Sequence, residues 1–177
     1  MASRIPENSL SSFLTKRKIA NIDIHAATGI PTVEISKLRN GLIKKISAKK
    51  LVLIMLSIGE NIADVIEEIY PNLSLMNITP GIKISNQTML GKFFDSVEDN
   101  TIKIISYKTG ITIGRLKSLK TKSNAIPLAH ELFLIELATE QKIGSLFNLL
   151  FKNLSLNTPQ EQLRLREIEK IKSAKKR

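Results

Sequence analysis

The sequence of 177 residues contains no cysteine, no tryptophan and only two histidines, and aromatic residues make up 5% of it. Without cysteine, the chain can form neither a disulfide framework nor a thiolate metal site. It also lacks the glycine-rich phosphate loop and the dinucleotide-binding fingerprint of many nucleotide-dependent enzymes. We therefore expect a protein that is not an enzyme and that has no catalytic residue, no metal site and no cofactor.

Long apolar runs are also missing. The longest one, Leu51 to Ile58, ends at Gly59 and is much shorter than the roughly 18 residues that a membrane-spanning helix needs. The opening residues, Met-Ala-Ser-Arg-Ile-Pro, include no apolar stretch of the kind found in a signal peptide. We expect a cytoplasmic protein with no membrane partner.

Positive charge is abundant, and it is unevenly placed. The net charge is +11, from 27 Lys and Arg against 16 Asp and Glu. Six cations and no acid lie between residues 37 and 50, whereas acids gather between residues 60 and 68. A basic stripe of this kind suits a phosphate backbone, because each lysine or arginine that binds phosphate releases condensed counterions. The alternative is an ordinary solvated basic face.

An internal repeat is the clearest feature that the sequence does have. When the chain is shifted by 81 positions, 16 of the 63 residues from Phe13 to Leu75 are identical to their counterparts, without a gap. Chance would give roughly one match in fifteen positions. Most matches are apolar, which indicates that the two copies share one core pattern.

Helical periodicity and capping residues predict an all-α protein with two five-helix units. We place the first unit at 8–75, a linker at 76–88, the second unit at 89–156, and a C-terminal helix with a basic tail at 157–177. In the first unit the helices are expected from about residue 10, over 21–28, 32–38 and 48–57, and from Ile62 to Ile69. Thr158-Pro159-Gln160-Glu161 has the form of a capping box, so the last helix is expected from Pro159 to about Ile171, followed by a disordered tail.

The segment from Gly29 to Gly41 has a turn glycine, a short amphipathic helix and a closing glycine. Its sequence is Gly-Ile-Pro-Thr-Val-Glu-Ile-Ser-Lys-Leu-Arg-Asn-Gly. This order, within five helices, resembles the Cro/repressor-type family of helix-turn-helix domains, also called lambda-repressor-like or xenobiotic-response-element domains. The chain is thus expected to hold two tandem lambda-repressor-like domains, the second with Thr121-Lys122 in place of the closing Asn-Gly.

The resemblance implies that the third helix of each unit, 32–38 and 112–120, lies in the major groove of DNA. It places these residues at base edges: Thr32, Val33, Lys37, Ile113 and Ser118. It places these near phosphates: Asn21, Asn40, Lys44, Lys45, Arg115, Lys117, Lys120 and Lys122. His25, four positions before the turn glycine, is expected to be a packed or partly exposed structural residue and not a ligand.

The function expected from this resemblance is that of a DNA-binding transcriptional regulator, of the repressor type, from a bacterium or phage. Two alternatives stay open. The fold could serve an interaction or accessory protein, antitoxin-like or phage-encoded, or an architectural protein that binds nucleic acid without sequence preference. The second unit could contact DNA, or it could brace the first. The expected partner is double-stranded DNA, with a homodimer or a protein partner as further possibilities.

Overall fold

A computed structural model describes residues 8–75, 88–96 and 102–174, and in these ranges it contains eleven helices and no strand. The all-α prediction is confirmed. The first unit holds five helices: α1 (Leu10–Lys16), α2 (Asn21–Thr28), α3 (Thr32–Arg39), α4 (Ala48–Ser57) and α5 (Ile62–Ile69). The second holds another five: α6 (Met89–Ser96), α7 (Ile102–Thr109), α8 (Ile113–Thr121), α9 (Ala129–Ala138) and α10 (Ser145–Phe151). The last helix is α11 (Pro159–Ala174).

Local sequence explains where the helices of the first unit begin. The Ser47 hydroxyl accepts from the backbone N–H of Lys50 at the start of α4, and the Asn61 side chain accepts from the N–H of Ala63 at the start of α5. Such side chains satisfy donors that have no partner within the helix. The predicted apolar face of α5 is buried, and its members are Ile62, Val65, Ile66 and Ile69.

The second unit repeats the helix positions of the first. Helices α7 and α9 begin and end 81 residues after α2 and α4, which is also the offset of the sequence repeat. The expected linker at 76–88 lies outside the described residues except for Thr88. At the other end, α11 continues to Ala174, so Lys172 to Ala174 belong to the helix and not to the expected tail, and residues 175–177 lie outside the described ranges.

The two units are joined by a reciprocal pair of backbone hydrogen bonds just before α4 and α9. Ala48 N–H donates to the Pro127 carbonyl and Ala129 N–H donates to the Ile46 carbonyl, both at 2.9 Å, around a bridge between Ser47 and Leu128. Residues 46 and 48 correspond to residues 127 and 129 at the repeat offset. Each unit therefore offers the same residues to the other, as the two subunits of a twofold dimer do.

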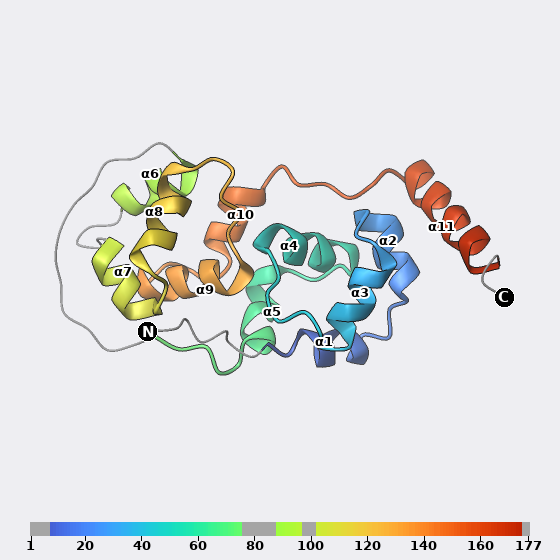
Figure 1. Cartoon of the computed structure of the whole chain (residues 1–177), viewed down its shortest axis with the longest axis horizontal. Helices are drawn as coiled ribbons and strands as arrows, with labels where there is room; N and C mark the ends of the chain where they lie inside the picture. Colours follow the sequence, from blue (N-terminus) through green and yellow to red (C-terminus); the bar gives the residue numbers. More distant parts are fainter. Residues whose placement is uncertain (1–7, 76–87, 97–101, 175–177) are drawn as a thin grey trace.

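A second pair of equivalent positions meets at the same joint. Gly144 lies so close to Ala63, its counterpart 81 positions earlier, that a Cβ atom on Gly144 would be 2.9 Å from the Ala63 Cα. Beside them, Tyr70 of the first unit packs edge-on against His130 and tilted against Phe133 of the second. In Figure 1 the central helices α4, α5, α9 and α10 separate α3 in one half from α8 in the other.

In the part of the chain that the structure describes, no helix is long and apolar enough to cross a membrane.

Candidate functional site

The turn between α2 and α3 is built from three consecutive residues with a defined hydrogen-bond pattern. Gly29 takes a left-handed φ of 74°, and its N–H donates to the His25 carbonyl at 2.8 Å. Thr28 donates from its hydroxyl to the Ile24 carbonyl and accepts from the Ile30 N–H at 3.1 Å. A left-handed φ suits glycine because a Cβ atom would clash there. The turn sets the direction in which α3 leaves α2.

The same turn occurs again between α7 and α8. Gly110 has a φ of 70° and donates to the Ser106 carbonyl at 2.8 Å. Thr109 donates to the Ile105 carbonyl and accepts from the Ile111 N–H at 3.1 Å. All of these partners lie 81 residues after those of the first turn. The two Thr-Gly-Ile segments therefore share the same hydrogen bonds and a left-handed glycine.

Helix α3 turns one face to the core and another to the solvent. Ile35 and Leu38 are buried, whereas Val33 is 63% exposed and Lys37 is exposed. Thr32, in the first turn of α3, is half-buried because its hydroxyl donates to the Glu169 carboxylate of α11 at 3.2 Å. Lys37 and most of Val33 are thus exposed, whereas Thr32 is in contact with the C-terminal helix.

Helix α8 is divided in the same way. Leu116 and Leu119 are buried, Ile113 is 38% exposed, and Lys117 is exposed. Ser118 is half-buried. Gly114 lies on the outside with no atom near the position of a Cβ. The exposed face of α8 therefore carries one lysine, as the exposed face of α3 does, but at a different position.

The residues expected near phosphate fall into two groups. Those with exposed side chains are Asn40, Lys44, Lys45, Lys117 and Lys122. The others are buried or are occupied by contacts within the protein. The Asn21 side chain accepts from the Arg39 guanidinium at 2.9 Å, Arg115 pairs with Glu131, and Lys120 is only 2% exposed. These three are structural in the conformation described, which leaves the five exposed residues as candidates.

The buried Lys120 corresponds to Arg39 of the first unit. The Arg39 guanidinium donates to the carbonyls of Leu14 and Ile19 as well as to Asn21, so it ties the end of α3 to the connection between α1 and α2. Lys120 occupies the equivalent position, 81 residues later. A count of cations in the sequence cannot distinguish a buried lysine or arginine from an exposed one, because the direction of the side chain depends on the neighbouring helix.

One ion pair occurs in both units with its charges exchanged. In the first unit Lys50 of α4 lies 2.5 Å from the Glu34 carboxylate of α3. In the second, the equivalent residues are Arg115 of α8 and Glu131 of α9, 2.7 Å apart. Glu131 also accepts from the Leu128 N–H, and the Arg115 guanidinium also donates to the Ile126 carbonyl. This hydrogen bonding to Glu131 raises the pKa of Arg115.

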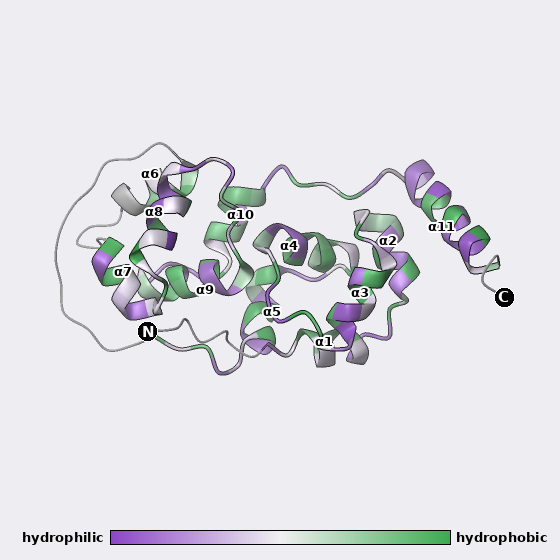
Figure 2. Cartoon of the chain, in the orientation of Figure 1, coloured by the Kyte–Doolittle hydropathy of each residue, from purple (hydrophilic) through white to green (hydrophobic). Residues whose placement is uncertain are grey.

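The C-terminal helix lies against the first unit, a placement that the sequence did not predict. The connection from α10 brings Asn157 to the end of α2, where its backbone N–H donates to the Ala27 carbonyl at 2.8 Å and its side chain donates to the Ala26 carbonyl at 2.9 Å. Figure 1 shows α11 at the far end of the molecule, next to α2. Figure 2 shows hydrophilic and hydrophobic residues alternating along α11.

The two histidines have structural surroundings. His25 is buried, with Nδ1 2.8 Å from the Ile30 carbonyl, so this nitrogen must carry a proton to donate. His130 is buried at the joint between the units, and burial lowers its pKa. Within the described ranges, no group of three or more His, Asp or Glu side chains is placed to hold a metal ion.

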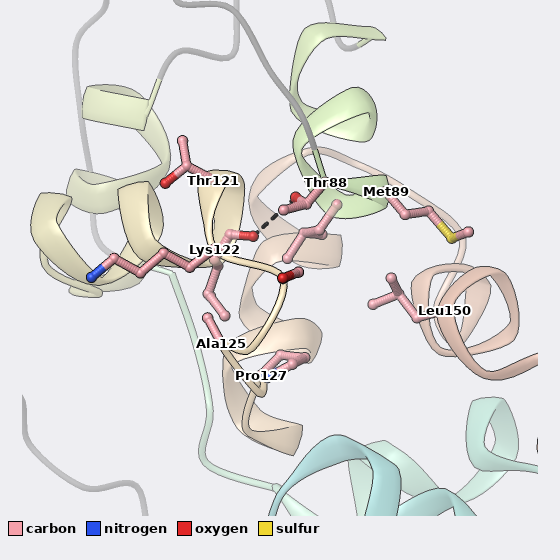
Figure 3. Close-up of a pocket in the computed structure, with 10 residues that line it drawn as sticks. Thr88, Met89, Thr121, Lys122, Ala125, Pro127 and Leu150 are labelled. Atoms are coloured by element: carbon pink, nitrogen blue, oxygen red, sulfur yellow. Dashed lines mark hydrogen bonds between the residues drawn. The ribbon is translucent and has the colours of Figure 1, made fainter.

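A cavity of about 500 Å³ lies in the second unit between α6, α10 and the loop after α8. Figure 3 shows Met89 and Leu150 on one side of it and Lys122 on the other, with the Lys122 amine extending away from the other labelled residues. The wall of the cavity is mostly apolar. The hydroxyl of Thr88, one of its polar groups, already donates to the Leu119 carbonyl. We assign no ligand to this cavity, since its one ammonium group does not face inward.

Comparison with known proteins gave no match for the chain, whether to a protein-family model, a curated protein or a solved structure.

Proposed function

We propose that the protein is a DNA-binding regulator that uses α3 and α8 as the recognition helices of two tandem helix-turn-helix units. One observation carries the proposal. The same glycine turn is built twice with the same hydrogen bonds, and each copy positions a helix whose outer face is exposed and carries a lysine. A short helix presented in this way after a tight turn is the element that enters the major groove in such proteins.

The distribution of charge supports a nucleic-acid partner. Lys37, Lys44 and Lys45 are exposed on α3 and on the loop that follows it, and Lys117 and Lys122 are exposed on and just after α8. These cations accompany a net charge of +11. Cations beside a recognition helix bind phosphates and fix its position, while the residues on its outer face contact the bases.

The two helices would recognise unlike half-sites. At equivalent outward positions, α3 presents Val33 and Lys37, whereas α8 presents Gly114 and Ser118. Lysine donates to guanine and valine packs against a thymine methyl group, but glycine offers neither contact. Two units that are related by an approximate twofold axis but present different side chains would favour an asymmetric operator. Two identical subunits would instead bind a palindrome.

Binding to duplex DNA at several salt concentrations tests the proposal. We expect Lys37→Ala/Lys117→Ala to weaken binding, whereas Lys142→Ala/Lys152→Ala, which removes the same charge from exposed positions outside the two recognition helices, should have little effect. Replacing a base-contacting lysine should cost about 1 to 3 kcal/mol. Binding that falls steeply with salt in the unchanged protein is also expected. Equal losses in the two double variants would contradict specific contact by α3 and α8.

A further inference from the structure

Helix α11 covers the start of α3, where the expected base contacts of the first unit lie. The Glu169 carboxylate accepts from the Thr32 hydroxyl at 3.2 Å. Between α11 and the turn is a cavity of about 320 Å³, lined by His25, Pro31, Thr32, Val33, Glu169, Lys172 and Ser173. Two of the three residues expected at base edges are therefore in the wall shared with α11, and the third, Lys37, is not.

The contact is shallow, and the half-buried side chains of α11 are both polar and apolar. None of the α11 residues is buried. Its anchors are Asn157 on the end of α2, the Arg166 guanidinium 3.2 Å from Asp23, and the Glu169 contact to Thr32. The Arg166–Asp23 pair is partly exposed, and exposed pairs contribute less than about 1 kcal/mol. A helix held in this way can separate from α2 without unfolding either unit.

The contact also places an acidic side chain, paired with a lysine of α11, beside the first turn of α3. Glu169 is paired with Lys172 of α11 at 2.7 Å and lies beside the half-buried Thr32. Hydrogen bonding to Lys172 lowers the pKa of Glu169, so its carboxylate is ionised at neutral pH. DNA that approached α3 from this side would meet a carboxylate and the end of a helix at the point where it needs the first turn of α3.

We propose that docked α11 is an autoinhibitory clasp that closes the recognition helix of the first unit, and that release of α11 opens it. The proposal rests on the proposed DNA-binding function. The docked and released forms would differ in the first unit alone, because α11 and α8 lie at opposite ends of the molecule (Figure 1). The apparent affinity would then be the affinity of the open form multiplied by the fraction of molecules in which α11 is released.

A reversible cross-link tests the clasp in the full chain. The sequence has no cysteine, so Asp23→Cys/Arg166→Cys places the only two thiols at the α2–α11 contact. A bifunctional methanethiosulfonate reagent can join them, and reduction frees them in the same molecule. The control is the same variant treated with a monofunctional reagent. The DNA is the duplex that the reduced variant enriches from a random pool.

We expect the joined form to bind this duplex at least about tenfold more weakly than the reduced form, and the control to bind as the reduced form does. Failure of the two thiols to join would contradict the docked position of α11. Joining with unchanged or tighter binding would overturn the clasp while leaving DNA binding intact. No enrichment by the reduced form would contradict the proposed function itself, and the clasp with it.

A second pair of variants needs no cross-link. Glu169→Gln removes the charge beside Thr32, and Glu167→Gln removes the same charge from an exposed position two residues earlier. We expect Glu169→Gln to tighten binding several-fold and Glu167→Gln to leave it within about twofold, because a distant surface charge is screened by salt. An equal change in both would mean that only net charge matters and would overturn the clasp.

Discussion

At the scale of single residues, the ion pair with exchanged charges gives the clearest correspondence between the two units. Positions 34 and 50 hold Glu and Lys, and positions 115 and 131 hold Arg and Glu, with contacts of 2.5 and 2.7 Å. The two helices that contribute each pair are the equivalent ones. The same contact is thus kept with either sign, which indicates that attraction between these two positions matters more than which of them carries the positive charge.

The first prediction follows from this exchange. Lys50→Glu should destabilise the protein by about 1 kcal/mol, since it places two carboxylates together at a partly exposed site. Glu34→Arg/Lys50→Glu, which copies the arrangement of the second unit, should restore most of the loss. Urea unfolding of the two variants and of Glu34→Arg alone measures the coupling. Losses that simply add in the double variant would contradict an attractive pair.

Glu136 is a second residue whose environment has a measurable consequence. It is fully buried, and its carboxylate accepts from the backbone N–H groups of Gly144 and Leu146 at 2.9 and 2.6 Å. It thereby caps the start of α10. Burial raises the pKa of Glu136 above its ordinary value of 4.5, although the backbone hydrogen bonds partly oppose the shift.

The second prediction is a pH dependence with a defined sign. Because the pKa of Glu136 is raised in the folded state, its contribution to stability is complete below pH 4.5 and is lost as the pH rises through the raised value. The free energy of unfolding of the unchanged protein, minus that of Glu136→Gln, should therefore decrease as the pH increases over this range. Denaturant unfolding at several pH values measures it, and a difference that increases would contradict the assignment.

Residue-level prediction from the sequence was good where a local rule applies and poor where a neighbour decides. The turn at Gly29 and the closing Gly41 follow from local backbone needs, and both residues have a left-handed φ. Exposure of Lys37, Lys44 and Lys45 also agrees with the expected basic surface. Arg115 and Lys120 were expected near phosphate, but their side chains turn to Glu131 and into the protein. The directions of these two side chains depend on tertiary packing, which a count of charges in the sequence does not reveal.

At the scale of elements, two glycines in the second unit have opposite surroundings. A Cβ on Gly144 would lie 2.6 Å from the Ala63 Cβ, and Gly144 has a left-handed φ of 83°. Gly114 lies within α8 with nothing near the position of its Cβ. One glycine is required by the joint between the units, and the other only lowers the stability of its helix.

The third prediction compares these two positions. Gly144→Ala should destabilise the protein by about 2 to 4 kcal/mol, through the close approach to Ala63 and the unfavourable φ. Gly114→Ala should stabilise it by up to about 1 kcal/mol, because alanine favours a helix interior. Thermal or urea unfolding separates the two. Tolerance of alanine at residue 144 would show that the units do not meet as described.

Helix positions were largely predictable, whereas helix docking was not. The bounds of α2, α4 and α5 follow from periodicity, caps and closing glycine or proline residues. The end of α11 was placed about three residues too early because Lys172 begins the basic run that ends at Arg177, and such a run resembles a disordered tail. Its docking involves Asn157, Arg166 and Glu169, whose polar contacts a hydrophobic pattern does not predict.

At the scale of the whole molecule, the reciprocal hydrogen bonds at Ser47 and Leu128 set two units in a twofold relation within one chain. The repeat in the sequence indicated two copies, but not which surfaces join them. The apolar face of α5 is buried. Tyr70, directly after α5, extends this packing across to His130 and Phe133.

The fourth prediction concerns acid at this joint. Burial lowers the pKa of His130. The negative charge of Glu131 acts to raise this pKa, and the positive charges of Lys45 and Arg115 act to lower it. Because this pKa is lowered in the folded state, the contribution of neutral His130 to the free energy of unfolding is complete above pH 6.5. It is lost as the pH falls through the lowered pKa. His130→Phe should remove this part of the acid sensitivity. Unfolding between pH 7 and 5 in both proteins measures it, and unchanged sensitivity in the variant would contradict the prediction.

The central claim, that α3 and α8 contact DNA as two unlike recognition helices, is tested most directly by selection of bound duplexes from a random pool at near-physiological salt. The intact protein, Lys37→Ala and Lys117→Ala are compared. We predict a motif of two different half-sites about 10 base pairs apart, with Lys37→Ala relaxing one half-site and Lys117→Ala weakening the other. No enrichment, or a motif that both variants retain unchanged, would contradict the account.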